Sequence, residues 1–440
     1  MKVQDILGID FLLLLASISL TTFGILFIYS SGVTSAGELV SNEYIKQIVW
    51  GVSGLVIAMI LSIINYHKLQ NISLYFYIAT LLLLIYTMKF GREVNGAKAW
   101  IGIGGFGIQV SEFTKITTIL CLAQYLDYSK QKANSFLRFL ISCVIVFVPM
   151  GIILMQPDLG TSLVFIPILL VMTFVAGVAL RYVLFLGSLI GLAAFFVFLT
   201  LWQDHILIAT KNEPYAAITM LTNTRFVTVC CLALALIGFI ALLGLLLYKK
   251  GYFFWILYGV TIVIFSLGGS FSALKILKSY QRERLIIFLN PNIDPKGAGW
   301  HIIQSTTAIG SGGLMGKGYL QGTQSHYQFL PQQSTDFIFS IFSEEWGFVG
   351  GIIVFVLFLL ISIRLVRIMA TASDTFGAYI AAGLCALYIF HFIVNVGMTM
   401  GIMPITGIPL LFMSYGGSSV IASMMGIGLA LSIHMRRFIH

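Results

Sequence analysis

The chain has 440 residues, of which 59% are hydrophobic and only 9% are charged. Soluble globular domains contain about 45–50% apolar and about 25% charged residues. This composition excludes a soluble enzyme, a disordered chain, a coiled-coil rod and a disulfide scaffold. A polytopic helical membrane protein remains, because the apolar runs are continuous and longer than the alternating segments of about 10 residues in membrane β-barrels.

The charge balance fits that class. The 25 basic and 16 acidic residues give a net charge of +9. In a membrane protein the distribution of Lys and Arg along the chain matters more than their sum, and we expect no nucleic-acid partner. The five cysteines lie in apolar runs without metal-ligand spacing, so they are interpreted as packing residues.

Twelve apolar stretches predict membrane crossings. They are 9–30, 47–65, 71–88, 112–127, 137–155, 159–178, 182–203, 226–248, 252–274, 337–363, 376–400 and 408–434. An even number of crossings puts both termini on one side of the membrane. Short connections rich in Lys and Arg share that side, and the positive-inside rule makes it the cytoplasm. The sequence therefore predicts an all-α, polytopic membrane helix bundle, one integral membrane domain over 1–440 with both termini cytoplasmic.

The longer connections then face outward, and 275–336 is by far the longest of them. A structureless loop of that length is improbable in a compact domain. We therefore expect this large extracytoplasmic loop to carry helices of its own and a function. Eight glycines in 297–322 suit a backbone that bends tightly and approaches a ligand.

Two charged residues open the fourth predicted span. Glu112 and Lys115 are three residues apart and share one helix face. They form either an N-terminal cap with a local ion pair or a charged cavity wall near the outer surface. Because Lys115 lies a turn inside the span, it needs an acidic partner or an anionic ligand, and a pyrophosphate-bearing substrate would suit it.

Two aspartates stand at span boundaries. Asp158 lies in the tight turn between the fifth and sixth spans, and Asp336 ends the long loop before an aromatic-rich helix. Each could cap the helix that follows it. Alternatively, Asp158 lines the same cavity as Lys115.

Glu344 and Glu345 follow Asp336 closely. Either they lie inside a span, or residues 335–346 form a short interfacial helix and the span begins near Gly347. We favour the second arrangement because it buries less charge in the membrane.

The stretch 102–107 matches the pattern G-x-G-x-x-G. We do not interpret it as a nucleotide site, because it lies in a predicted outer loop with no βαβ unit around it.

Several stretches in chain order resemble the motifs of the SEDS family (shape, elongation, division and sporulation). They are Gln156–Ser162, Gly299–Ser305, Ala308–Gly313, Gly316–Gly318, Gly322–Ser325, Thr335–Phe339 and Pro409–Ser418. The resemblance runs from the first span to the C-terminus. It is closest to the RodA branch, the elongation-type peptidoglycan glycosyltransferases.

The resemblance implies a ten-span enzyme that polymerises lipid II at the outer face of the bacterial cytoplasmic membrane, during cell elongation and shape maintenance. It implies a class B penicillin-binding protein transpeptidase and other elongation-complex membrane proteins as partners. It also implies a divalent cation, Mg²⁺ or Mn²⁺, with unknown ligands. Ten spans leave two of our twelve over, so we predict that 226–274 is an inserted transmembrane hairpin.

The resemblance also implies site residues. Asp336, at the family's Thr-Asp-Phe position, would be the catalytic carboxylate. The candidate substrate-binding or cavity residues are Glu112, Lys115, Asp158, Gln304, Ser305, Arg282 and Arg284. The two arginines are included because of their charge and not because of the resemblance: they are candidates for pyrophosphate or headgroup contact, with plain interfacial snorkelling as the alternative.

The sequence departs from the family pattern at a few positions. Asn290 stands where the family has the aspartate of Leu-Asp-Pro, and Val110 replaces the proline of Gln-Pro-Ser-Glu. The first departure excludes a catalytic carboxylate at position 290.

The implied chemistry is attack of a sugar hydroxyl on an anomeric carbon whose leaving group is a lipid pyrophosphate. A carboxylate beside the acceptor can serve as general base, and positive charge from a metal ion, Lys or Arg can neutralise the leaving group. Two other classes stay open: a flippase of the lipid-linked cell-wall precursor, and a scaffold for wall-synthesis partners.

Overall fold

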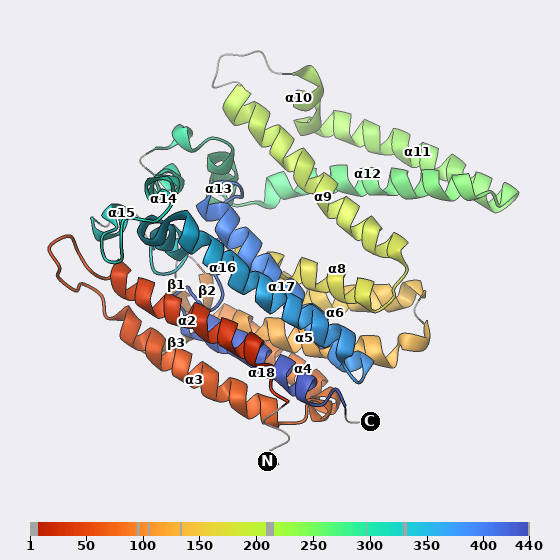
Figure 1. Cartoon of the computed structure of the whole chain (residues 1–440). Coiled ribbons are helices and arrows are strands. Elements are labelled where there is room, and N and C mark those ends of the chain that lie inside the picture. Colours follow the sequence, from red (N-terminus) through yellow and green to blue (C-terminus); the bar gives the residue numbers. More distant parts are fainter. Residues whose placement is uncertain are drawn as a thin grey trace. The chain divides into compact units, whose positions relative to one another are not determined.

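The computed structural model describes residues 8–94, 97–103, 106–132, 134–207, 215–295, 297–327, 329 and 332–438. The chain forms two compact units (Figure 1). Unit 1 comprises Met1–Val178 and His301–His440, and unit 2 comprises Ala179–Trp300.

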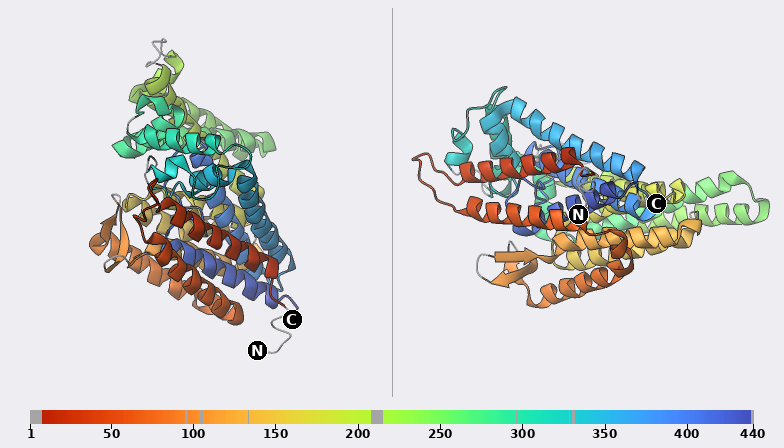
Figure 2. Two further views of the ribbon diagram at one scale, coloured as in Figure 1. Left: turned by 60° about the vertical axis from the view of Figure 1, so that its left-hand side comes forward. Right: turned by 60° about the horizontal axis from the view of Figure 1, so that its bottom comes forward.

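Unit 1 is a bundle of long apolar helices. Its helices are α2 (Phe11–Ser31), α3 (Glu43–Ile63), α4 (His67–Phe90), α5 (Val110–Tyr128), η1 (Lys130–Lys132), α6 (Phe136–Met155), α7 (Leu159–Leu163), α8 (Phe165–Val175), most of α14 (Ala298–Ser311), α15 (Thr323–His326), α16 (Ile338–Thr371), α17 (Thr375–Thr399) and α18 (Gly417–Met435). Figure 1 and both views of Figure 2 show α2, α3 and α18 side by side.

The core of unit 1 lies around α17 and α18. Of the residues in their apolar stretches, 78% and 83% are buried, against 22% in α4. Close backbone approach explains part of this burial. A Cβ on Gly428 of α18 would lie 2.6 Å from the carbonyl oxygen of Ala58 on α3, so only glycine lets these two helices approach so closely.

α16 is two helices joined at a break. Gly347 has φ 64° and ψ −159°, inside the range of α16. At the break the loop backbone pairs with the helix: Phe348 N donates to Gly313 O at 2.9 Å, and Lys317 N donates to Glu344 O at 3.1 Å. The expected separate helix before Gly347 is therefore present, and the glycine is needed because its φ lies in the left-handed region.

Unit 2 contains α9 (Leu180–Trp202), the π-helical turn η2 (Gln203–Leu207), α10 (Ala216–Thr222), α11 (Thr224–Tyr248), α12 (Gly251–Ile276), α13 (Ser279–Leu289) and η3 (Pro291–Ile293). α11 and α12 form a helical hairpin, and Lys249 at its turn has the left-handed φ of 51°. The helices expected within 226–274 and within the long loop are therefore present. That 226–274 is an insertion stays a prediction.

The fold class is confirmed: this is a polytopic helical membrane protein. Ten helices among the described residues are long and apolar enough to cross a membrane. The other two of the twelve predicted stretches are α5, which carries Glu112, Lys115 and Asp127, and the short pair α7–α8. The last predicted stretch, 408–434, begins too early, because α18 starts at Gly417.

The predicted outer loop before α5 holds a small antiparallel sheet that the sequence did not predict. Its strands are β1 (Arg92–Val94), β2 (Ala97–Ile103) and β3 (Phe106–Gln109), in the order β1-β2-β3. Gly102 pairs with Gly107 across β2 and β3. The two ends of the G-x-G-x-x-G pattern therefore lie on paired antiparallel strands rather than between a strand and a helix, which agrees with rejecting it as a nucleotide site. Positions 104 and 105 of the pattern lie outside the described residues.

Candidate active site

Glu112 and Lys115 form a buried ion pair on α5. Both carboxylate oxygens of Glu112 lie 2.9 Å from Lys115 Nζ, and the Lys115 side chain is only 2% exposed. The Nε2 atom of His391 on α17 lies 3.1 Å from the same Nζ. Three acceptors match the three N–H donors of an ammonium group. The local ion pair is therefore present, and contact of Lys115 with an anionic ligand stays a prediction.

His391 links the Glu112–Lys115 pair to the segment before α18 through hydrogen bonds of its two ring nitrogens. An ammonium only donates, so His391 Nε2 accepts and Nδ1 holds the proton. Nδ1 then donates to the carbonyl oxygen of Pro409 at 3.1 Å. Sequence reasoning missed His391, although an ionisable residue inside a predicted span is a signal that could have found it.

Asn395, one turn further along α17, holds the backbone of the predicted catalytic residue. Its Nδ2 donates to the carbonyl oxygens of Ile408 at 2.8 Å and Asp336 at 3.0 Å. Asn395 was also missed by the sequence analysis. Its two bonds join α17, the start of α16 and residues 401–416, which we call the connecting segment.

Asp336 is half-buried and precedes α16. The N-cap of α16 is Phe337 and has no side-chain capping bond. The catalytic role of Asp336 and its capping alternative both stay predictions. Its backbone is fixed on both sides, because its amide donates to Gln332 O at 3.2 Å while its carbonyl accepts from Asn395.

Asp158 caps α7. Its two carboxylate oxygens accept from Thr161 N at 3.0 Å and Thr161 Oγ1 at 2.7 Å, and Gln109 Nε2 lies 3.2 Å from Oδ2. The capping alternative is confirmed, and a place for Asp158 in a substrate cavity stays a prediction. The same turn touches the connecting segment, since a Cβ on Gly160 would lie 2.3 Å from Thr406 O.

Ser305 links three helices. Its Oγ lies 2.6 Å from both the Thr399 carbonyl oxygen of α17 and the Ser340 Oγ of α16, and the side chain is fully buried. Gln304 beside it is half-buried and makes no side-chain hydrogen bond among the residues that the structure describes. Of this neighbouring pair, Gln304 is thus the residue whose polar group is available to a ligand.

Glu344 and Glu345 hold residues 317–324, the end of the glycine-rich part of the long loop, against α16. Glu344 Oε1 accepts from Lys317 Nζ at 2.7 Å and from Thr323 N at 2.8 Å. Glu345 accepts from Ser30 Oγ, and from Leu320 N at 3.1 Å. Both side chains are fully buried. The contacts that satisfy Glu344 come from the loop, and those that satisfy Glu345 come from the loop and from Ser30 of α2. Their role in the structure is to organise the loop.

Tyr319 lies in the same loop. Its hydroxyl donates to Leu26 O at 3.0 Å. Burial, with Glu345 nearby, raises the pKa of Tyr319 to about 12, so the phenol stays protonated and keeps this bond at neutral pH.

Arg282 and Arg284 belong to α13 of unit 2. Arg282 Nη2 donates to the Leu274 carbonyl oxygen, and the Arg284 guanidinium lies 5.8 Å from the Tyr280 ring centroid. These contacts are local to unit 2. Their assignment to pyrophosphate stays a prediction.

Within the described part of the chain, no three His, Cys, Asp or Glu side chains come together as metal ligands. Mg²⁺ commonly binds through one or two carboxylates plus substrate phosphates. The described residues form no such cluster by themselves, and a bound divalent cation stays a prediction.

The Glu112–Lys115 pair, the Asp158 turn and the Asp336 backbone are each linked to the connecting segment through a neighbouring residue, whereas Gln304 and Ser305 show no such link among the described residues. Thr406 meets the turn of Asp158, Ile408 is bonded to Asn395, and Pro409 is bonded to His391. Through these contacts the segment is tied to the Lys115 pair and to the backbone of Asp336. The half-buried Asp336 thus lies on a rigid frame, which suits a group that must meet a substrate in one geometry.

The chain matches a known protein family and several known proteins. The family model described as cell cycle protein, FtsW/RodA/SpoVE, matches residues 11–219 and 214–438. The chain is 50% identical to the peptidoglycan glycosyltransferase RodA of Treponema pallidum (strain Nichols), which covers 99% of this chain and 100% of that protein. It is 33% identical to the peptidoglycan glycosyltransferase MrdB of Escherichia coli (strain K12), covering 98% of this chain and 95% of that protein.

A solved structure has the same architecture. It is described as "Structural coordination of polymerization and crosslinking by a peptidoglycan synthase complex", and it matches with a TM-score of 0.65 and 25% identity over 98% of this chain and 99% of that one. The resemblance that the motifs indicated is confirmed over nearly the whole length: the chain belongs to the FtsW/RodA/SpoVE family of cell cycle proteins, the SEDS family.

Proposed function

We propose that this chain is a peptidoglycan glycosyltransferase that polymerises lipid II at the outer face of the bacterial cytoplasmic membrane during cell elongation. Two full-length relatives bear the name peptidoglycan glycosyltransferase. The observation that carries the proposal within the molecule is Asp336. It is half-buried, it directly precedes α16, and its backbone is held by Asn395.

In the proposed reaction Asp336 acts as general base. Its carboxylate takes the proton of an acceptor sugar hydroxyl, whose oxygen forms a bond to the anomeric carbon of the donor. The bond from that carbon to the lipid pyrophosphate breaks, and the pyrophosphate leaves with the electron pair. Pyrophosphate needs no proton when its charge is neutralised, so a second catalytic acid of the kind that glycosidases use is not required.

The buried network positions this base. Lys115 is hydrogen-bonded to His391, which is hydrogen-bonded to the Pro409 carbonyl oxygen. Asn395 donates to the carbonyl oxygens of Ile408 and Asp336. Lys115 and His391 are therefore positioning residues in this proposal. Gln304 is the candidate for direct substrate contact, because its side chain is half-buried and makes no hydrogen bond among the described residues.

Asp336→Asn tests the proposal directly. Asn keeps the size of Asp but cannot take the proton. Loss of a general base costs about 10²–10⁴-fold in rate, so polymerisation of lipid II by the purified chain should fall by that factor while lipid II binding persists. Asp204→Asn is the matched control, since Asp204 is exposed in η2, and it should keep the wild-type rate.

The rival function, flipping of the lipid-linked precursor, makes the opposite prediction. A flippase in liposomes would move labelled lipid II without polymerising it. If the purified wild-type chain translocates lipid II and forms no glycan, the glycosyltransferase proposal is wrong. Wild-type polymerisation with a near-normal Asp336→Asn rate would instead move the base to another carboxylate.

Partner and cofactor complete the proposal. We infer a class B penicillin-binding protein as transpeptidase partner, supported by the likeness to a structure described as coordinating polymerization and crosslinking. We also infer a divalent cation, held mainly by the pyrophosphate of lipid II. Titrating EDTA and then Mg²⁺ or Mn²⁺ into the polymerisation assay tests that requirement.

A further inference from the structure

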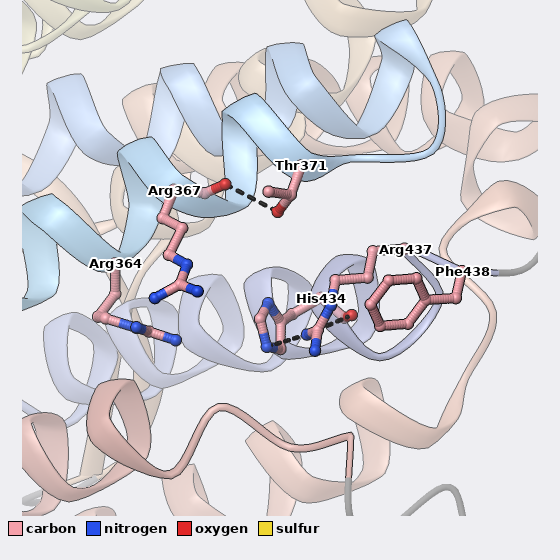
Figure 3. Close-up of a pocket in the computed structure, with 6 residues that line it drawn as sticks. All are labelled: Arg364, Arg367, Thr371, His434, Arg437 and Phe438. Carbon is pink, nitrogen blue, oxygen red and sulfur yellow. Dashed lines mark hydrogen bonds between the residues drawn. The ribbon is translucent and has the colours of Figure 1, made fainter.

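A strongly basic pocket lies where α16 and α18 end. Asp336 precedes the opposite end of α16, so the pocket is separate from the candidate active site. Its volume is about 260 Å³, and it is lined by Arg364, Arg367, Thr371, His434, Arg437 and Phe438 (Figure 3). Pockets for drug-sized ligands have volumes of about 300–1,000 Å³. The pocket therefore suits a small ligand or the headgroup of a larger one.

The charges in and around the pocket do not cancel. The Nε and Nη2 atoms of Arg364 each lie 2.7 Å from Asp10 Oδ2. Arg367 makes no side-chain hydrogen bond or ion pair among the described residues, and its side chain is exposed. Two helix ends contribute about −0.5 each and Asp10 contributes one negative charge. Among the described residues, three guanidinium groups outweigh that sum, so this lining favours an anion.

His434 adds a buried donor. The Nη1 atom of Arg437 is hydrogen-bonded to His434 Nε2. Guanidinium groups only donate, so Nε2 accepts and the proton of the neutral ring is on Nδ1. That Nδ1 has no partner among the described residues, although His434 is only 7% exposed. A buried donor without an acceptor is costly, and a ligand that offers an acceptor would remove this cost.

The orientation of the ring supports that interpretation. Figure 3 shows His434 between the side chain of Arg437 and those of Arg364 and Arg367, with the nitrogen that does not face Arg437 directed toward the Arg367 side. Thr371 Oγ1 donates to the Arg367 carbonyl oxygen at 2.8 Å. The free polar groups of the pocket are therefore donors, and they converge from two helices.

The location indicates the source of the ligand. The pocket lies near the C-terminus, on the side of the membrane that the Lys and Arg distribution predicts to be cytoplasmic. Phe438 at its edge is 80% exposed. Basic pockets between transmembrane helices on this side suit anionic lipid headgroups.

We propose that this pocket binds a phosphate group, supplied by the headgroup of an anionic phospholipid in the cytoplasmic leaflet. Arg367, Nη1 of Arg364, which has no hydrogen-bond partner in the part of the chain that the structure describes, and Nδ1–H of His434 donate to the phosphate oxygens. The proposal is independent of the glycosyltransferase function.

Lipid binding to the purified full chain tests this proposal. Native mass spectrometry would titrate phosphatidylglycerol, phosphatidylcholine and inorganic phosphate separately. The wild type should retain one phosphatidylglycerol in preference to phosphatidylcholine, whose choline cancels the phosphate charge. Because a hydrogen bond to a charged group is worth about tenfold or more in affinity, Arg367→Gln and His434→Phe should each weaken that binding about tenfold.

Arg181→Gln is the matched control. Arg181 is exposed at the start of α9 and lies outside the pocket, so the variant loses the same charge and should bind as the wild type does. Inorganic phosphate that displaces the lipid at equal concentration would identify a soluble phosphate as the source. The proposal is overturned if the wild type shows no preference for phosphatidylglycerol and no phosphate binding, which would favour an acidic protein segment as occupant. Equal weakening in Arg181→Gln and Arg367→Gln would also overturn it.

Discussion

The core of unit 1 and the hairpin of unit 2 are both built from long apolar helices, yet they differ in burial. In α17 and α18, 78% and 83% of the apolar stretch is buried, whereas in α11 and α12 the shares are 17% and 22%. The buried pair contributes His391 and Asn395 to a hydrogen-bonded network. The hairpin faces its surroundings with apolar side chains such as Leu236 and Trp255.

The difference shows that hydrophobicity has different consequences in the two regions. In the hairpin it matches a lipid environment, where apolar side chains need no protein partner. In the core it surrounds polar groups whose bonds must all be made within the protein, because water is absent. Substitutions in the core should therefore be costly, and matched substitutions at exposed positions should be mild.

The largest effect on stability is expected from Lys115→Met. Removing one partner of a buried pair costs about 3–5 kcal/mol, because Glu112 is left charged and unpaired. Thermal unfolding of the purified variant in detergent, followed by intrinsic fluorescence, measures the loss. The double variant Lys115→Met/Glu112→Gln should recover part of it.

A second pair, between Asp127 at the end of α5 and Lys130 in η1, provides the control for that variant. Lys130 and Asp127 are also three residues apart, at 3.5 Å, but the Lys130 side chain is 59% exposed. Exposed pairs are worth about 0–1 kcal/mol, so Lys130→Met should change the unfolding temperature little. Equal losses for Lys115→Met and Lys130→Met would contradict the role given to burial.

A matched pair of glycines gives an intermediate effect. In Gly428→Ala the new Cβ would meet the backbone of Ala58 at 2.6 Å, and such overpacking costs about 1–3 kcal/mol. A Cβ added to Gly259 of α12 would have no neighbouring atom within 4 Å, so Gly259→Ala should be neutral or gain up to about 1 kcal/mol from helix propensity. Unfolding temperatures of the two variants check this order, and the reverse order would refute the proposed close contact of α18 with α3.

The smallest effect is expected from replacing 226–274 with a short linker. The hairpin contacts α9 through few polar bonds, among them Tyr258 Oη to Arg181 O at 2.8 Å and Ser266 Oγ to Leu189 O at 3.2 Å. Lipid can cover the α9 face that the deletion exposes. Lipid II polymerisation by the folded deletion variant should remain within a few-fold of wild type, about tenfold or more above the Asp336→Asn variant. A folded deletion variant without activity would show that the hairpin shapes the site.

The sequence alone determined the class, the helices and the family. Apolar runs of about 20 residues have few alternatives to a membrane helix, and all twelve predicted stretches contain helices. The sequence also predicted local contacts. The i,i+3 spacing of Glu112 and Lys115 predicted their ion pair. The cost of placing Glu344 and Glu345 within a membrane span predicted a separate helix before Gly347, where α16 is broken. Each of these features depends on residues that are close together in the chain.

Only the tertiary structure decided which polar groups meet. His391 is 276 residues from Lys115, and Asn395 is 59 residues from Asp336. No periodicity relates residues so far apart, because their contact depends on how whole helices pack. The same holds for the basic pocket, where the ends of α16 and α18 bring Arg367 and His434 to one cavity. Helix formation is a local property of this chain, whereas satisfying buried donors and charges is a property of the packed bundle.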